Sequence, residues 1–261
     1  NDYLEKADKI LDIDYYTDYI IGQSWIADTD WPYNNIKMVK GDFTGYRWRF
    51  ILQDLEWALN PNGWTDSGHD HINYMLNYDL NNLYLRFWRE LIKNPQYKRQ
   101  FINRFADIMN SSYLPENTIG IAQSIFDSSY SEMRSEYVRW GGGESQANNR
   151  MNQYNANMVT FKSELTKRST NVRNHILSNF SLTAKYSVEL QVQPENTGLV
   201  QMNTITPETY PWKGLYFTGN PIRMEAKETG NYVFDGWEPN IYIKDVNNPV
   251  IEVDIKSSGY K

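Results

Sequence analysis

Two carboxylates and a carboxamide stand at spacings that suit phosphoryl transfer. Asp30 and Asn35 are separated by four residues, and Asp54 follows after the segment 36–53. That segment predicts a strand, a turn and a second strand, because β-forming residues flank the turn-rich stretch 41–45. A tight hairpin returns the end of its second strand to the start of its first. We therefore expect Asp54 to lie close to Asn35.

These residue types have defined roles in phosphoryl transfer. One Asp orients a hydroxyl, while an Asn and a second Asp hold a metal. Oxygen ligands from Asn35 and Asp54 suit a hard cation, Mg²⁺ or Mn²⁺, whose other positions would be taken by nucleotide phosphates and water. Asp30 would accept or orient the proton of the attacking hydroxyl. The alternative is structural, since Asp and Asn also favour turns and caps.

The sequence around these residues resembles a known family. The motif is Asp28-Thr29-Asp30-Trp31-Pro32-Tyr33-Asn34-Asn35, followed by Trp48-Arg49-Phe50-Ile51-Leu52-Gln53-Asp54-Leu55-Glu56-Trp57. It resembles the C-terminal lobe of the CotH-type kinases, the spore-coat protein H family of atypical protein kinases. The resemblance continues through the segments 94–107 and 139–180. It implies ATP as the phosphate donor, Mg²⁺ or Mn²⁺ as cofactor, and Ser or Thr hydroxyls of a protein substrate as acceptors.

The same resemblance assigns the site residues. It implies that Asp30 is catalytic, that Asn35 and Asp54 bind the nucleotide through the metal, and that Glu56 is a further metal ligand. Glu56 stands where the family often has a second Asp, and Ala58-Leu59 replaces a more usual glycine-aromatic pair. No glycine-rich phosphate loop or strand Lys precedes Asp30. We therefore expect a C-terminal fragment that lacks its N-lobe and has little activity alone.

The hydrophobic periodicity predicts an α+β fold in two domains. Residues 1–180 read as a mainly α-helical, kinase-like C-lobe with a β-hairpin at the catalytic loop, and residues 181–261 as a small, sandwich-like all-β domain. Helices are expected at 14–27, from Asp79 or Asn81, from Asn94-Pro95, at 117–139 and at 148–178, with 58–78 as a loop. Strands are expected at 186–192, 222–226, 232–234 and 251–255. Ile121, Ile125, Met133 and Val138 are expected to be buried.

Other polar clusters favour structural roles. His69-Asp70-His71 offers three metal ligands in a row, but adjacent residues of an extended loop point in opposite directions, so a solvated loop is favoured. The three glycines at 141–143 lack a preceding strand and are expected to end a helix. Arg104 and Asp107 are expected to pair with each other and buttress the lobe.

Composition limits the classes of partner. The chain has 261 residues, a formal net charge of −6 and no Cys. It therefore lacks the basic field that a nucleic acid requires, and no run is long and apolar enough to span a membrane. The resemblance implies an exported, cell-surface or periplasmic bacterial protein, although composition leaves the cytoplasm open.

A second hypothesis is a non-catalytic surface, coat or adhesion protein. In that case the helical lobe is a pseudokinase, and aromatic residues of the β domain bind a glycan or a protein. The candidates for this surface are Tyr210, Trp212, Tyr216 and Trp237.

Overall fold

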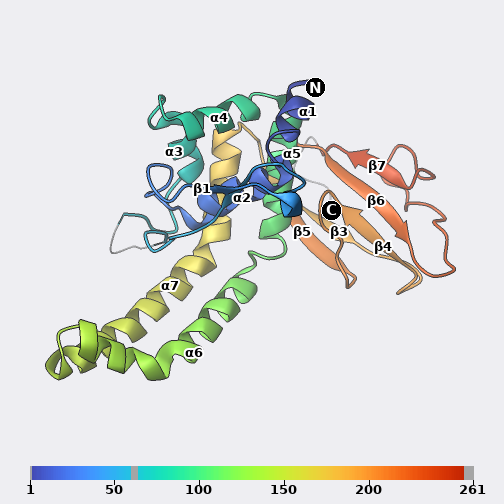
Figure 1. The fold of residues 1–261 in the computed structure, drawn as a ribbon. Helices are drawn as coiled ribbons and strands as arrows, with labels where there is room; N and C mark the ends of the chain where they lie inside the picture. The colour runs from blue at the N-terminus through green and yellow to red at the C-terminus, as the bar shows by residue number, and fades with distance from the viewer. Residues whose placement is uncertain (1, 60–63, 256–261) are drawn as a thin grey trace.

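The structure is a computed structural model that describes residues 2–59 and 64–255 (Figure 1). Part of the predicted 58–78 loop, 60–63, and the end of the chain, 256–261, lie outside the described residues. The fold is α+β, with helices followed by small antiparallel sheets. The elements are α1 (Asp2–Asp8), α2 (Ile13–Ile26), β1 (Lys37–Val39), the 3₁₀ turn η1 (Asp42–Thr44), β2 (Arg49–Ile51), α3 (His71–Asn77), α4 (Leu83–Ile92), α5 (Pro95–Met109), α6 (Pro115–Trp140), α7 (Glu144–Asn179), β3 (Lys185–Leu190), β4 (Gly198–Met202), β5 (Trp212–Phe217), β6 (Ile222–Glu228) and β7 (Val250–Val253).

Helix α2 lies at the centre of the helical part and contacts α3, α5, α7 and the hairpin. The Asp12 side chain caps it by accepting a hydrogen bond from the Tyr15 amide at 3.3 Å. Ile20 and Ile21 are fully buried, whereas Tyr15 is exposed. The helix ends before Ala27, which adopts the left-handed conformation. This turn directs the chain into the segment that carries Asp28 and Asp30.

Helix α3 was not predicted, and α4 begins later than predicted; each starts after a capping residue. Residues 71–77, predicted as loop, form α3, because the Asp70 side chain accepts a hydrogen bond from the Asn73 amide at 2.9 Å. The next helix begins at Leu83 rather than at Asp79 or Asn81, and Asn82 caps it. In contrast, α5 begins at Pro95 with Asn94 as its cap, as predicted.

Helices α6 and α7 form an antiparallel arm that projects from the body (Figure 1). Gly142 and Gly143 join them with positive φ angles, so the glycines end a helix as expected. The predicted burial on α6 is wrong, because no residue of this fully described helix is buried. Ile121 is 62% exposed and Ile125 is 64% exposed. Only the C-terminal half of α7, from Glu164 onward, and Ala147 contribute buried residues.

The strands after residue 184 form two antiparallel sheets. One has the order β3-β5 and the other β4-β6-β7. The residues 232–234, predicted as a strand, lie in an irregular connection before β7. The buried hydrophobic side chains of the helices and of these sheets belong to one continuous cluster. The β part is therefore packed on the helical part and shares its core.

Helix α5 presents a polar face to the β part. Asn103, Asp107 and Asn110 recur at helical spacing, and each bonds to a residue beyond 200. The expected Arg104–Asp107 pair is wrong: Arg104 pairs with Asp18 at 2.6 Å and donates to the Thr204 hydroxyl at 2.8 Å. Both side chains do buttress the structure, but they do so across the boundary between the helices and the sheets.

Asp107 is a fully buried carboxylate at this boundary. It accepts hydrogen bonds from the Thr204 amide at 2.9 Å, the Thr204 hydroxyl at 2.6 Å, the Tyr216 hydroxyl at 2.8 Å and the Asn203 amide group at 3.2 Å. Burial raises the pKa of Asp107, and these donors lower it in part. Tyr216 is therefore a core residue, unavailable to a glycan. Tyr210, Trp212 and Trp237 are half-buried against the core.

Candidate functional site

The hairpin brings Asn35 next to Asp54. Lys37 pairs with Ile51, Met38 with Phe50 and Val39 with Arg49. This register places the residues just before β1 beside those just after β2. The Asn35 side-chain amide donates to the Asp54 backbone carbonyl at 3.3 Å. The two residues that the sequence placed at opposite ends of a hairpin therefore lie in contact.

Asp30 joins the same group. Asn35 also donates to Asp30 Oδ2 at 2.9 Å, and Asn34 donates to Asp30 Oδ1 at 2.7 Å. The Asp30 backbone carbonyl accepts from the amides of Tyr33 and Asn34, which closes a tight turn. The Asn35 carboxamide thus links Asp30 to Asp54, and the Asp30 carboxylate is held in a fixed orientation.

Both hairpin ends are held in an uncommon backbone conformation. Asn35 has a φ of 59° and Asp54 a φ of 56°. Left-handed backbone is tolerated by Asn and Asp better than by other residues with a side chain, and it clusters at functional sites. The Asp54 and Glu56 side chains are exposed, while Asp30 and Asn35 are half-buried. The group therefore faces solvent on one side and the folded body on the other.

The donor chemistry of Asn35, Asp54 and Glu56 fits a hard divalent cation. All three side chains offer oxygen ligands, and the neighbouring Asp54 carboxylate raises the pKa of Glu56 through a hydrogen bond. Such proximity of like charges is relieved when a cation binds between them. Among the described residues, no three His, Cys, Asp or Glu side chains are grouped closely enough to hold a metal by themselves. A cation here would need the Asn35 oxygen and ligands from a nucleotide.

Asp28 is a further acidic residue that the pattern of spacings did not single out. Its side chain is fully buried, and Oδ1 accepts a hydrogen bond from the Asp30 amide at 3.2 Å. Burial raises the pKa of Asp28 to about 6, the Asp30 and Trp31 amides lower it in part, and the charges of Asp30 and Glu56 raise it further. Its place at the first position of the family motif was the signal that could have identified it. Asp28 positions the backbone of Asp30.

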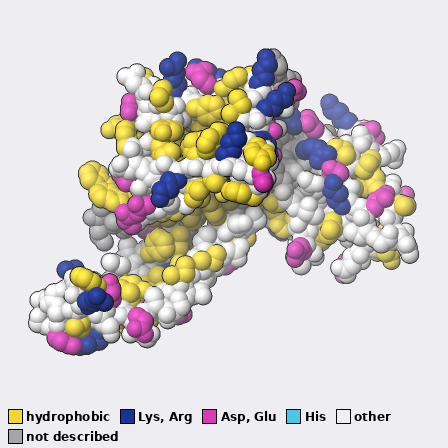
Figure 2. All heavy atoms as spheres, in the orientation of Figure 1, with side chains coloured by type: hydrophobic (Ala, Val, Ile, Leu, Met, Phe, Trp, Pro, Cys, Tyr) yellow, Lys and Arg dark blue, Asp and Glu magenta, His cyan; other side chains and the backbone are white. Residues whose placement is uncertain are grey.

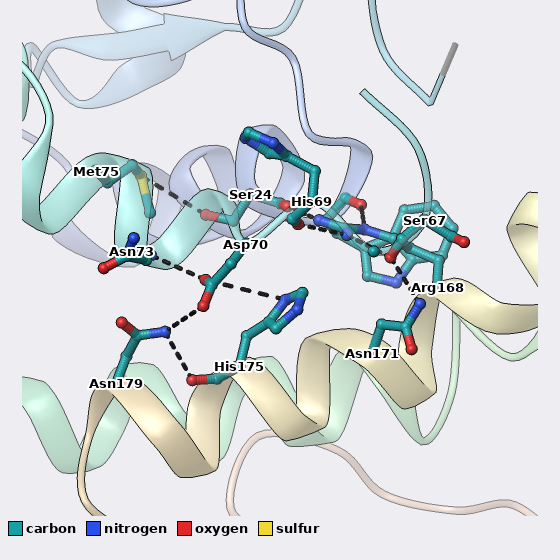
Figure 3. Close-up of polar contacts among 12 residues, drawn as sticks. Ser24, Ser67, His69, Asp70, Asn73, Met75, Arg168, Asn171, His175 and Asn179 are labelled. Atoms are coloured by element: carbon teal, nitrogen blue, oxygen red, sulfur yellow. Dashed lines mark hydrogen bonds and ion pairs between the residues drawn. The ribbon is translucent and has the colours of Figure 1, made fainter. Parts of the chain in front are cut away.

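Helix α7 supports the start of this loop through Arg168 (Figure 3). Arg168 is 1% exposed and donates to four backbone carbonyls: Ser24 at 2.7 Å, Ser67 and His69 at 2.8 Å each, and Trp25. Burial lowers its pKa to about 10, so it remains charged at neutral pH. Two of the carbonyls belong to the last turn of α2, where a cation complements the helix dipole. Arg168 therefore fixes the point at which the chain enters the Asp28 to Asn35 loop.

The His69-Asp70-His71 segment is part of this support and is not a solvated loop. His71 is 1% exposed, begins α3 and lies close to Trp31, with ring centroids 6.0 Å apart. Asp70 caps α3 and accepts a hydrogen bond from Asn179 at 2.8 Å (Figure 3). Burial lowers the pKa of His71 well below its ordinary value, so it stays neutral. The expectation that this segment is solvated is wrong, because α7 packs against it.

One of the comparisons with known proteins identifies a family. No curated protein and no solved structure matches the chain. The CotH kinase protein family matches residues 1–172, which include the Asp28 to Asn35 motif, the hairpin and most of α7. No helix among the described residues is long and apolar enough to cross a membrane. Because the match covers well over half of the sequence, the chain belongs to the CotH kinase protein family.

Proposed function

We propose that this chain is the catalytic-loop part of an atypical protein kinase that transfers the γ-phosphate of ATP to a Ser or Thr hydroxyl of a protein substrate. The observation that supports this function is the Asn35 carboxamide, which contacts both Asp30 and Asp54. Residues 1–180 would be a kinase-like C-lobe and 181–261 a small β domain packed on it. The family also supports an exported or cell-surface location in a bacterium.

Each residue has one task in this proposal. Asp30 orients the acceptor hydroxyl and accepts its proton as the new bond between that oxygen and the γ-phosphorus forms and the bond to the ADP oxygen breaks. Asn34 and Asn35 hold the Asp30 carboxylate in place. Asn35, Asp54 and Glu56 would hold Mg²⁺ or Mn²⁺, which neutralises charge on the phosphates.

Calorimetric titration of ATP with Mn²⁺ or Mg²⁺ tests this function. Asp54→Asn should weaken nucleotide binding at least about tenfold, because one charged oxygen ligand is lost. Asp42→Asn is the matched control, since Asp42 is exposed in the same hairpin but lies in the turn, away from Asn35. Equal binding by the wild type and Asp54→Asn would remove Asp54 from the metal site. Absence of nucleotide binding by the wild type would favour a pseudokinase.

A further inference from the structure

The arm and the body enclose an apolar groove beside the candidate site. Its volume is about 750 Å³. One wall comes from the arm, through Ile125, Phe126, Met158 and Phe161, and the other from the segment that follows Asp54, through Leu55 and Ala58. We call this the arm groove. Hydrophobic side chains gather on the arm near its junction with the body (Figure 2).

The arm groove explains why α6 retains apolar residues that the core does not use. Ile125 is 64% exposed although it is large and apolar, and it lines the groove. Phe126 stacks on Tyr154 across the arm, with ring centroids 4.6 Å apart, so this wall has a fixed shape. Exposed apolar surface of this kind marks sites that bind a partner.

The groove borders the proposed phosphoryl-transfer site, because Glu56 belongs to both. Its lining includes Leu55 and Glu56, which directly follow Asp54. An extended peptide covers at most about 3.3–3.6 Å per residue, so a polypeptide whose hydroxyl lies at Asp30 needs only a few further residues to reach the groove. A volume of about 750 Å³ lies within the range of ligand pockets and holds a large side chain with its backbone.

The charge of the lining restricts the occupant. Glu56 is the only charged residue among the described residues that line the groove. A negatively charged side chain would face apolar walls and the Glu56 carboxylate, with no basic residue in the described part of this lining. An uncharged apolar side chain suits the same surface.

From this geometry we propose that the arm groove docks an apolar side chain of the protein substrate, a few residues from the Ser or Thr that receives the phosphate. The inference rests on the proposed function and adds to it a substrate class: polypeptides with a large aliphatic or aromatic residue near the acceptor. The arm is then the element that selects the substrate, while Asp30 and Asp54 serve the transfer itself.

Fluorescence anisotropy with labelled synthetic peptides tests the docking without nucleotide. The probes are nine-residue peptides with a central Ser and one test residue, and Ala fills the other positions. The test residue is either Leu or Asn, and it lies two, three or four residues before or after the Ser. At one or more positions the Leu peptide should bind the wild-type chain at least about tenfold more tightly than its Asn counterpart, since the Leu side chain leaves water.

The matched variants are Ile125→Glu and Ile121→Glu. Both residues are exposed on α6, but only Ile125 lines the groove. Ile125→Glu should remove the preference for Leu, and Ile121→Glu should keep it. Because α6 has no buried residue, neither change affects the core.

Several outcomes would overturn the docking. One is that the wild-type chain binds the Leu and Asn peptides equally well, or binds neither measurably. Another is that Ile125→Glu and Ile121→Glu change the preference for Leu equally. A dimer in sedimentation velocity that only Ile125→Glu dissociates, with no Leu preference, would assign the groove to a second copy and also overturn it. If the wild type binds no nucleotide while the Leu preference persists, the proposed transfer function fails and the docking of an apolar peptide side chain stands.

Discussion

Replacing Arg168 by Ala should destabilise the protein strongly and disturb the Asp28 to Asn35 loop. The guanidinium donates to the carbonyls of Ser24, Trp25, Ser67 and His69, and it is almost completely buried. Alanine would remove a donor from each of these four acceptors, although the Ser67 carbonyl would keep its hydrogen bond from Asn171 at 2.9 Å. A hydrogen bond contributes about 1 kcal/mol net, and its loss costs more where the remaining group stays buried.

The expected loss is therefore about 3–5 kcal/mol in the free energy of unfolding, from four bonds of about 1 kcal/mol each. That is a large share of the roughly 5–15 kcal/mol that holds a typical protein folded. Arg168→Lys should lose about half as much, because one ammonium keeps the charge but cannot reach carbonyls on both α2 and the segment after residue 64.

Urea denaturation followed by tryptophan fluorescence measures this effect. Arg150→Ala is the control on the same helix, because Arg150 is exposed and bonds only weakly to Gln153 at 3.4 Å. It should change the free energy of unfolding by less than about 0.5 kcal/mol. A loss below about 1 kcal/mol for Arg168→Ala would refute the view that Arg168 fixes the end of α2.

Three further changes probe the site and the domain boundary. Asp30→Asn should keep nucleotide binding but lower peptide phosphorylation by about 100-fold or more, since it removes the proton acceptor; undiminished phosphorylation would exclude that role. Because burial raises the pKa of Asp28 to about 6 from 3.8, the folded state binds this proton more tightly than the unfolded chain, and stability falls as the pH rises from about 4 to 6. Asp28→Asn should therefore flatten the pH profile and gain on the order of 2 kcal/mol relative to wild type at pH 7, as measured by urea denaturation; parallel profiles would contradict this. Asp107→Ala should cost about 3 kcal/mol and speed proteolysis near residues 181–184, because the donors of Asn203, Thr204 and Tyr216 lose their acceptor, whereas the exposed Asp127→Ala should leave the cleavage rate unchanged.

The local elements could be predicted where local chemistry decides them. Asn94-Pro95 begins a helix because the Asn side chain caps the free amides and Pro has the required φ, and α5 starts there. The hairpin was predictable for the same reason: its turn residues set the reversal, and the register that follows brings Asn35 to Asp54. The chemical roles of Asp30, Asn35, Asp54 and Glu56 stay predictions that the titration and phosphorylation assays address.

The partners of each side chain were decided by tertiary packing. Helical periodicity shows that Ile125 lies on an apolar stripe, but it does not show that this stripe leaves the body on a projecting arm. The sequence likewise placed Arg104 beside Asp107, while the folded chain gives each of them a partner from a distant segment.

The sequence by itself thus determined the family, most of the helices and strands and the hairpin that gathers the candidate site, because these follow from neighbours along the chain. Only the tertiary structure decided that His71 is buried, that Asp107 joins the helices to the sheets and that the arm encloses a groove next to Asp54. These features depend on contacts between residues that are far apart in sequence, and a single pattern of hydrophobic and polar residues is compatible with many such contacts.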